Sequence, residues 1–94
     1  MSNKSILETA HKIVNTIANL KSSQGYHSDP YEKIFEKYKM IVEIESSEKP
    51  DLEKLTPLLN WSKLYAYRIV FEAPIKCYAW DELLMEIDFF NSLI

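Results

Sequence analysis

Glycine and proline, which mark many of the turns in folded proteins, are few in this chain and are placed as in helical proteins. Gly25 is the only glycine, and the four prolines are Pro30, Pro50, Pro57 and Pro74. Each proline lies at or near an expected helix start, where the amide hydrogen that proline lacks would have no helical partner. This placement predicts an all-α fold.

Apolar residues recur at helical spacing in the first part of the chain. They are Ile6, Ala10, Ile13, Val14, Ile17 and Leu20. This spacing is typical of a helix with one buried face. Ser5 and Glu8 have the spacing of a capping box, and Gly25 suits the left-handed conformation that often follows a helix. We therefore expect a first helix over residues 5–22.

Three further helices are expected after the proline-containing starts. The clearest start is the second, where Asp29 is the expected N-cap, Pro30 lies in the first turn and Glu32 follows. The expected helices span residues 29–46, 57–72 and 75–92. With no internal repeat and no long linker, residues 1–94 are expected to form one domain, a small bundle of three to four helices.

The boundary between the last two expected helices allows a second interpretation. Residues 65–71 and 75–80 both have strong β propensity, which would give an α+β fold with a hairpin at about 64–80. Such a hairpin would leave both strand edges unpaired, and residues 72–74 lack the Gly, Asn or Asp that supplies positive φ in a tight turn. The helical interpretation is therefore favoured.

Composition and charge argue against several classes of partner. The net charge of −3 and the scattered basic residues oppose binding to a nucleic-acid backbone. No apolar run approaches the roughly 18 residues of a membrane span, and the N-terminal segment lacks the pattern of a secretory signal. The single cysteine, Cys77, cannot form an intramolecular disulfide. We expect a cytoplasmic protein that binds neither nucleic acid nor membrane.

Residues of the types used in catalysis and metal binding occur here without the spacing that either chemistry needs. Glu8 and His11 have the i, i+3 spacing of metal sites in helical bundles, but such sites need a second copy of the motif. Glu82 and Glu86 lie one turn apart on the polar side of the last expected helix, where we expect them to be solvated. Cys77 has no neighbouring glycine or helix start that would favour a reactive thiolate. We predict no catalytic residue, no metal and no cofactor.

Aromatic residues concentrate in the last third of the chain, where eight of the twelve lie between Trp61 and Phe90. Tyrosine, tryptophan and arginine are enriched at the energetic centres of protein interfaces, because they bury a large area and keep a polar group. A role in the core explains the same residues, although so many tyrosine hydroxyls favour some exposure or subunit contact. The candidate partner-binding residues are Trp61, Tyr65, Tyr67, Arg68 and Trp80.

Self-association is the simplest use of this aromatic segment. A helix over residues 57–72 would be apolar on nearly all sides, and 47% of all residues are hydrophobic. The other short helices of one chain would cover only part of it, and a second copy could cover the rest isologously. We expect a homodimer whose interface includes Trp61, Tyr65 or Arg68.

Three functions from different classes fit these patterns. The main hypothesis is a small non-enzymatic helical protein that acts by binding another protein, as immunity proteins, antitoxins and adaptors do. The first alternative is a helical bundle that binds a small apolar ligand or a metal in its aromatic core. The second alternative is an enzyme whose site is built at a dimer interface.

Overall fold

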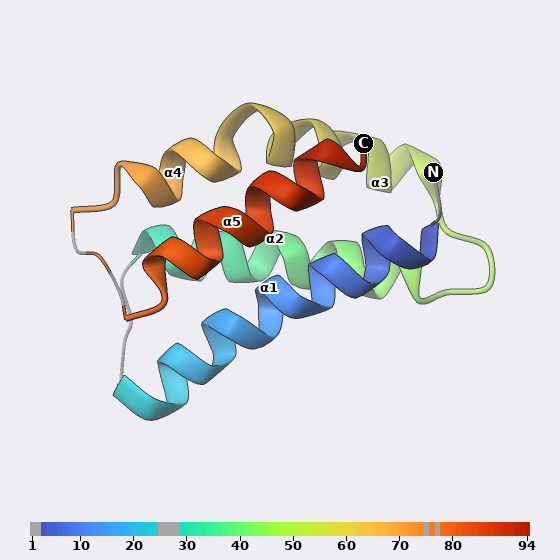
Figure 1. Cartoon of the computed structure of the whole chain (residues 1–94). Coiled ribbons are helices and arrows are strands. Elements are labelled where there is room, and N and C mark those ends of the chain that lie inside the picture. Colours follow the sequence, from blue (N-terminus) through green and yellow to red (C-terminus); the bar gives the residue numbers. More distant parts are fainter. Residues whose placement is uncertain (1–2, 25–28, 75, 77) are drawn as a thin grey trace.

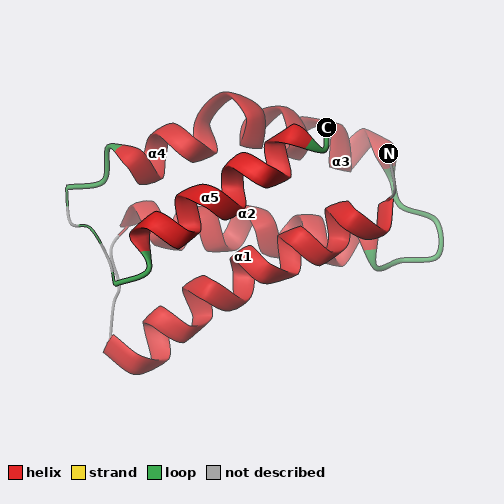
Figure 2. Cartoon of the chain, viewed as in Figure 1, coloured by secondary structure: helices red, strands yellow, loops and turns green. Residues whose placement is uncertain are grey.

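The computed structural model describes residues 3–24, 29–74, 76 and 78–94, which form helices joined by loops, without a strand (Figures 1 and 2). The predicted all-α fold is thereby confirmed. The alternative hairpin at about 64–80 is wrong, because residues 64–71 are helical. The β propensity of that segment is overridden by packing, which buries one side of the helix in the bundle.

The helices are α1 (Asn3–Gln24), α2 (Asp29–Glu45), α3 (Leu52–Trp61), a π-helix (Ser62–Ala66), α4 (Tyr67–Phe71) and α5 (Trp80–Ser92). The middle three elements form one continuous rod. Trp61 and Tyr67, at the two junctions, both keep right-handed helical angles, with φ and ψ of −60° and −44° and of −59° and −46°. We call this rod the α3–α4 helix, and with it the described residues form a bundle of four helices.

Consecutive helices run in opposite directions across the bundle (Figure 1). α1 packs on α2 and α5, and the α3–α4 helix packs on the same two helices from the other side. This is the up-and-down arrangement that short connections favour. None of the helices in the part of the chain that the structure describes is long and apolar enough to cross a bilayer.

The core is built from the apolar stripes of all four helices. Its fully buried larger side chains are Ile13, Ile17, Tyr31, Ile34, Tyr38, Ile41, Val70, Leu83, Ile87 and Phe90. Tyr38 lies near the centre, where its ring meets Phe90 edge to face, with ring centroids 5.2 Å apart and an interplanar angle of 89°. Such pairs contribute about 0.5–1.5 kcal/mol beyond the area they bury.

The first helix begins earlier than its capping pattern predicts. α1 starts at Asn3, so Ser5 lies inside the helix and the predicted capping box of Ser5 and Glu8 is wrong. The backbone oxygen of Ser5 instead accepts a hydrogen bond of 2.8 Å from the Thr9 hydroxyl. The predicted C-terminal signal at Gly25 lies outside the described residues.

The third helix also begins earlier, at Leu52 rather than at Pro57. Asp51 is the N-cap, since its carboxylate accepts a hydrogen bond of 3.0 Å from the amide of Glu53. Pro57 is therefore inside the helix. Its missing amide leaves one helical hydrogen bond unmade, and Pro57 is exposed to water.

The last helix begins later than the predicted residue 75. Pro74 lies in the loop that reverses the chain, and α5 starts at Trp80. The Trp80 indole N–H donates to the backbone oxygen of Val70 at 2.7 Å and so ties the start of α5 to α4. The proline here marks a turn between antiparallel helices and not a helix start.

Candidate functional site

The two tryptophans of the predicted binding cluster hold the bundle together. Trp61 is half-buried, and its ring meets that of Tyr38 edge to face with centroids 6.4 Å apart. The Lys37 ammonium lies 5.5 Å from the Trp61 ring centroid, within cation–π range. Trp80, also half-buried, bonds to the Val70 backbone. Both side chains have internal partners that account for their position.

The exposed members of the cluster lie on the outer side of the α3–α4 helix. We call this surface the outer stripe, and its residues are Lys63, Leu64, Tyr67, Arg68, Phe71 and Glu72. The exposed fraction is 67% for Leu64 and 55% for Phe71. Tyr65 flanks the stripe and is also exposed. Large apolar side chains with this exposure on one helix face mark an interaction surface more often than isolated ones do.

At its C-terminal end, near the loop before α5, the outer stripe contains a row of contacting aromatic rings. Tyr67 and Phe71 stack with ring centroids 6.1 Å apart and an interplanar angle of 14°. Phe71 also meets Trp80, at 5.9 Å between centroids, and the Lys76 ammonium lies 4.5 Å from the Trp80 centroid. Tyr67 and Trp80 thus share one aromatic row, whereas Trp61 contacts Tyr38 elsewhere on the helix.

Charges follow the same helix face. Arg68 and Glu72, one turn apart, form an ion pair of 3.1 Å. Both side chains are mostly exposed, so the pair contributes at most a few tenths of a kcal/mol. The outer stripe therefore has large hydrophobic side chains along its length and a charged residue, Lys63 or Glu72, at each end.

The outer stripe faces solvent because the opposite side of the helix is buried at a regular interval. Leu58, Ser62, Ala66 and Val70 are buried, and they recur at every fourth residue. A π-helix has more residues per turn than an α-helix, so it keeps this four-residue interval on one side. All strongly apolar residues between these positions are left outside or at the edge.

A buried polar network holds the first residue of the π-helix. The Ser62 hydroxyl donates to the Asn91 side-chain oxygen at 2.6 Å, and the Asn91 amide donates to the Ser62 backbone oxygen at 3.2 Å. Tyr38 Oη and Ser62 Oγ lie 2.5 Å apart. Because Ser62 already donates to Asn91, the Tyr38 hydroxyl is the donor in this pair. Burial raises the pKa of Tyr38 well above its usual value, which keeps this hydroxyl protonated.

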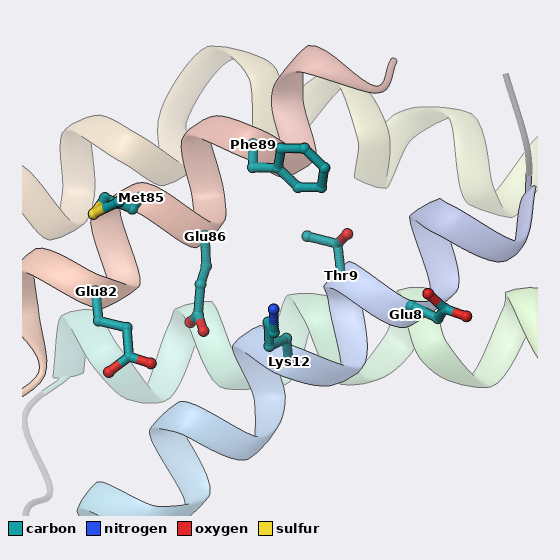
Figure 3. A pocket seen from close by; sticks show the side chains of 7 residues that line it. All are labelled: Glu8, Thr9, Lys12, Glu82, Met85, Glu86 and Phe89. Atoms are coloured by element: carbon teal, nitrogen blue, oxygen red, sulfur yellow. The ribbon is translucent and has the colours of Figure 1, made fainter.

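A pocket of about 650 Å³ lies between α1 and α5, away from the outer stripe (Figure 3). Its lining residues are Glu8, Thr9, Lys12, Glu82, Met85, Glu86 and Phe89. In Figure 3 the carboxylates of Glu82 and Glu86 reach from α5 toward α1, and the Phe89 ring lies above Thr9. The pocket thus has an acidic side and an apolar side.

The prediction that Glu82 and Glu86 are both solvated is wrong for Glu86. Only 9% of Glu86 is exposed, because α1 packs over this side of α5. The Thr16 hydroxyl lies 2.8 and 3.1 Å from its two carboxylate oxygens. Burial raises the pKa of Glu86, which the bond from Thr16 partly offsets; Glu82 raises it further and Lys12 lowers it. Glu82 is exposed, as predicted.

The candidate metal ligands do not converge in the structure. Glu8 and His11 are both exposed, and only Glu8 lines the pocket. Within residues 3–24, 29–74, 76 and 78–94, no three His, Cys, Asp or Glu side chains are grouped so that they could hold a metal ion. Cys77 lies outside these residues, so the prediction for its thiol stays a prediction.

Comparison of the chain with protein-family models, with curated proteins and with solved structures finds no match.

Proposed function

We propose that this protein acts by protein–protein binding and that its outer stripe pairs with a second copy of the chain. The observation that carries the proposal is the exposure of Leu64 and Phe71 on the outer side of a helix whose inner side builds the core. Leaving two such side chains in water forgoes about 1 kcal/mol or more for each, which a partner could recover. Immunity proteins, antitoxins and adaptors also act through protein–protein contacts, and here the partner proposed for the outer stripe is a second copy of the chain.

The charges of the outer stripe favour a second copy as the partner. Lys63 lies at one end of the stripe and Glu72 at the other, with Leu64 and Phe71 between them. If two copies of the helix pack antiparallel about an axis between Tyr67 and Arg68, each Leu64 faces the other copy's Phe71. Each Lys63 then faces the other copy's Glu72. Such self-complementarity is what an isologous interface requires.

The expected dimer is weak. The large side chains of the stripe are already partly covered within one chain, so each gains about half of the roughly 1.5–3 kcal/mol of full burial. Association costs about 4–15 kcal/mol in lost translational and rotational freedom. The gain exceeds the cost by about 4 kcal/mol at most, so we expect dissociation in the millimolar range.

Light scattering over a concentration series tests this proposal. The wild type should approach twice the chain mass of 11.1 kDa. Leu64→Glu should return the mass to that of a monomer, because it places two carboxylates in the interface. Leu52→Glu is the matched control: Leu52 is 68% exposed on the same helix but outside the stripe, and the variant should remain a dimer.

The register is tested by charge reversal. Lys63→Glu should weaken the dimer, and the double variant Lys63→Glu, Glu72→Lys should restore it in part, because Glu72→Lys also breaks the ion pair with Arg68 of the same chain. Lys63 also donates to the backbone oxygen of Ile94 at 2.9 Å, so the thermal midpoint is measured beside the mass. A wild type that keeps the monomer mass up to about 2 mM, or a dimer that survives Leu64→Glu, would refute the proposal.

A further inference from the structure

The pocket between α1 and α5 has the size and lining of a small-molecule site. Its volume of about 650 Å³ lies within the roughly 300–1,000 Å³ that ligand pockets span. Such pockets join apolar walls to a few converging polar groups, and here Phe89 and Met85 supply the former and Glu86, Glu82 and Lys12 the latter. None of these residues belongs to the outer stripe.

The Glu86 carboxylate has acceptor capacity that its protein partner does not fill. Glu86 as a whole residue is 9% exposed, and the donor to its carboxylate among the described residues is the Thr16 hydroxyl. That hydroxyl has one hydrogen, and the backbone oxygen of Lys12 competes for it at 2.9 Å. Since a carboxylate can accept about four hydrogen bonds, most of the capacity of Glu86 remains for a donor in the pocket.

The charge of the pocket determines which sign of charge a ligand should carry. Glu8, Glu82 and Glu86 line it, against the single cation of Lys12. A cationic ligand would stabilise the carboxylates that burial and mutual repulsion disfavour, whereas an anion would add to the repulsion. The grouping of donors among the described residues does not suit a metal ion, which needs three or more ligands around one point.

The apolar side of the pocket indicates the chemistry of the uncharged part of the ligand. Phe89 and Met85 are large and mostly exposed, and Figure 3 shows the Phe89 ring facing Thr9 across the opening. We propose that this pocket binds a small primary ammonium ion that carries an apolar chain or ring. Its N–H groups donate to Glu86 and Glu82, and its apolar part lies against Phe89 and Met85.

Titration with n-hexylammonium and phenethylammonium, followed by amide chemical shifts, tests the site. Both should bind saturably, with shifts concentrated at residues 8–12 and 82–89. Hexanol and hexanoate are the matched probes: they keep the apolar chain without the cation, and hexanoate should not bind. Equal binding of hexanoate and hexylammonium would overturn the proposal, as would the absence of saturation by either amine.

Two variants separate the ammonium contact from general effects of charge. Glu86→Gln keeps an acceptor for Thr16 but removes the charge, and should weaken hexylammonium binding about tenfold, the usual loss for a charge-assisted hydrogen bond. Asp88→Asn removes the same charge from an exposed position of α5 that does not line the pocket, and should leave affinity unchanged. Equal losses in both variants would refute the site. Glu82→Gln gives a second, exposed test should Glu86→Gln fail to fold.

The pH dependence gives an independent readout. The charged groups that act on Glu86 are the Glu82 carboxylate and the Lys12 ammonium, while Glu8 lines the far end of the pocket (Figure 3). Protonation of Glu86 removes the acceptor charge, so affinity should fall as the pH is lowered through its raised pKa. In Glu86→Gln this early fall should be absent. An unchanged pH profile in that variant would contradict the assigned contact.

Discussion

The Asn91 side chain holds Ser62 by two hydrogen bonds, one to its hydroxyl at 2.6 Å and one to its backbone oxygen at 3.2 Å. The pair links α5 to the first residue of the π-helix. Polar groups inserted beside a helix are a known cause of local departures from α geometry. The contact therefore couples the packing of α5 to the shape of the α3–α4 helix.

Asn91→Leu should lower the free energy of unfolding by about 2–3 kcal/mol, because it removes the acceptor of the buried Ser62 hydroxyl and the amide donor to the Ser62 backbone oxygen. For a domain of this size the thermal midpoint should fall by about 10 °C or more. Urea denaturation followed by circular dichroism measures the loss. Ser92→Ala, at a neighbouring exposed position whose hydroxyl donates to the Phe89 backbone oxygen of the same helix, should change stability by less than about 1 kcal/mol. Equal effects of the two variants would contradict this role for Asn91.

Glu86 should make stability depend on pH in an unusual direction for a carboxylate. Its pKa is raised above the ordinary value of 4.5, so the folded state holds the proton more tightly than the unfolded state. The resulting stability is full below about pH 4.5 and is lost as the pH rises through the raised pKa. Glu86→Gln should therefore be more stable than the wild type near pH 7, and the difference should vanish in acid. Denaturation midpoints of both proteins across this range measure it, and a variant less stable at pH 7 would show that the charge is favourable.

Trp61→Ala separates the core role of Trp61 from the interface role expected from the sequence. Trp61 packs on Tyr38 and is half-buried, so its loss should cost about 2–3 kcal/mol of folding stability. The mass measured by light scattering should not change, because Trp61 is not part of the outer stripe. A monomeric Trp61→Ala variant that melts like the wild type would place Trp61 in the interface instead.

Chelator treatment should leave the thermal midpoint unchanged. Glu8 and His11 are exposed, and neither forms a metal-type group with other described residues. Bound metal stabilises a fold by mass action, so a drop of several degrees with EDTA would reveal a site. Differential scanning fluorimetry with and without EDTA makes this comparison directly.

The parts of the fold that the sequence predicts are those encoded by local periodicity. The stripe from Ile6 to Leu20 and the signals around Pro30 placed α1 and α2 within a few residues, because one buried face at helical spacing is a local property. The start of α5 at Trp80 was missed because no capping side chain marks it, and the Trp80 indole bonds to Val70, ten residues away. Pro57 misled because a strong N-cap at Asp51 starts the helix first.

For the candidate partner-binding residues, the sequence predicts exposure better than it predicts contacts between helices. Exposure of Tyr65, Tyr67 and Arg68 follows from a helix with a single buried side, and the structure shows it. Glu86 has the pattern of a solvated residue, since nothing near it in sequence shows that α1 covers it. The opposite holds for Trp61, whose partner Tyr38 lies on another helix. Contacts between helices, rather than the local sequence, determine how far Glu86 and Trp61 are buried.

The π-helix also determines how this chain can change in length over evolution. Twelve residues separate Leu58 from Val70, which at about 100° per residue would leave the two positions roughly 120° apart on a regular α-helix. Eleven residues would bring them to within about 20° of each other. A relative that had lost one residue between 62 and 66 would therefore keep both side chains in the core on an unbroken α-helix. In a sequence alignment, a one-residue gap inside a helix usually indicates misalignment. Between residues 62 and 66, however, we expect such a gap to be a true difference between closely related chains.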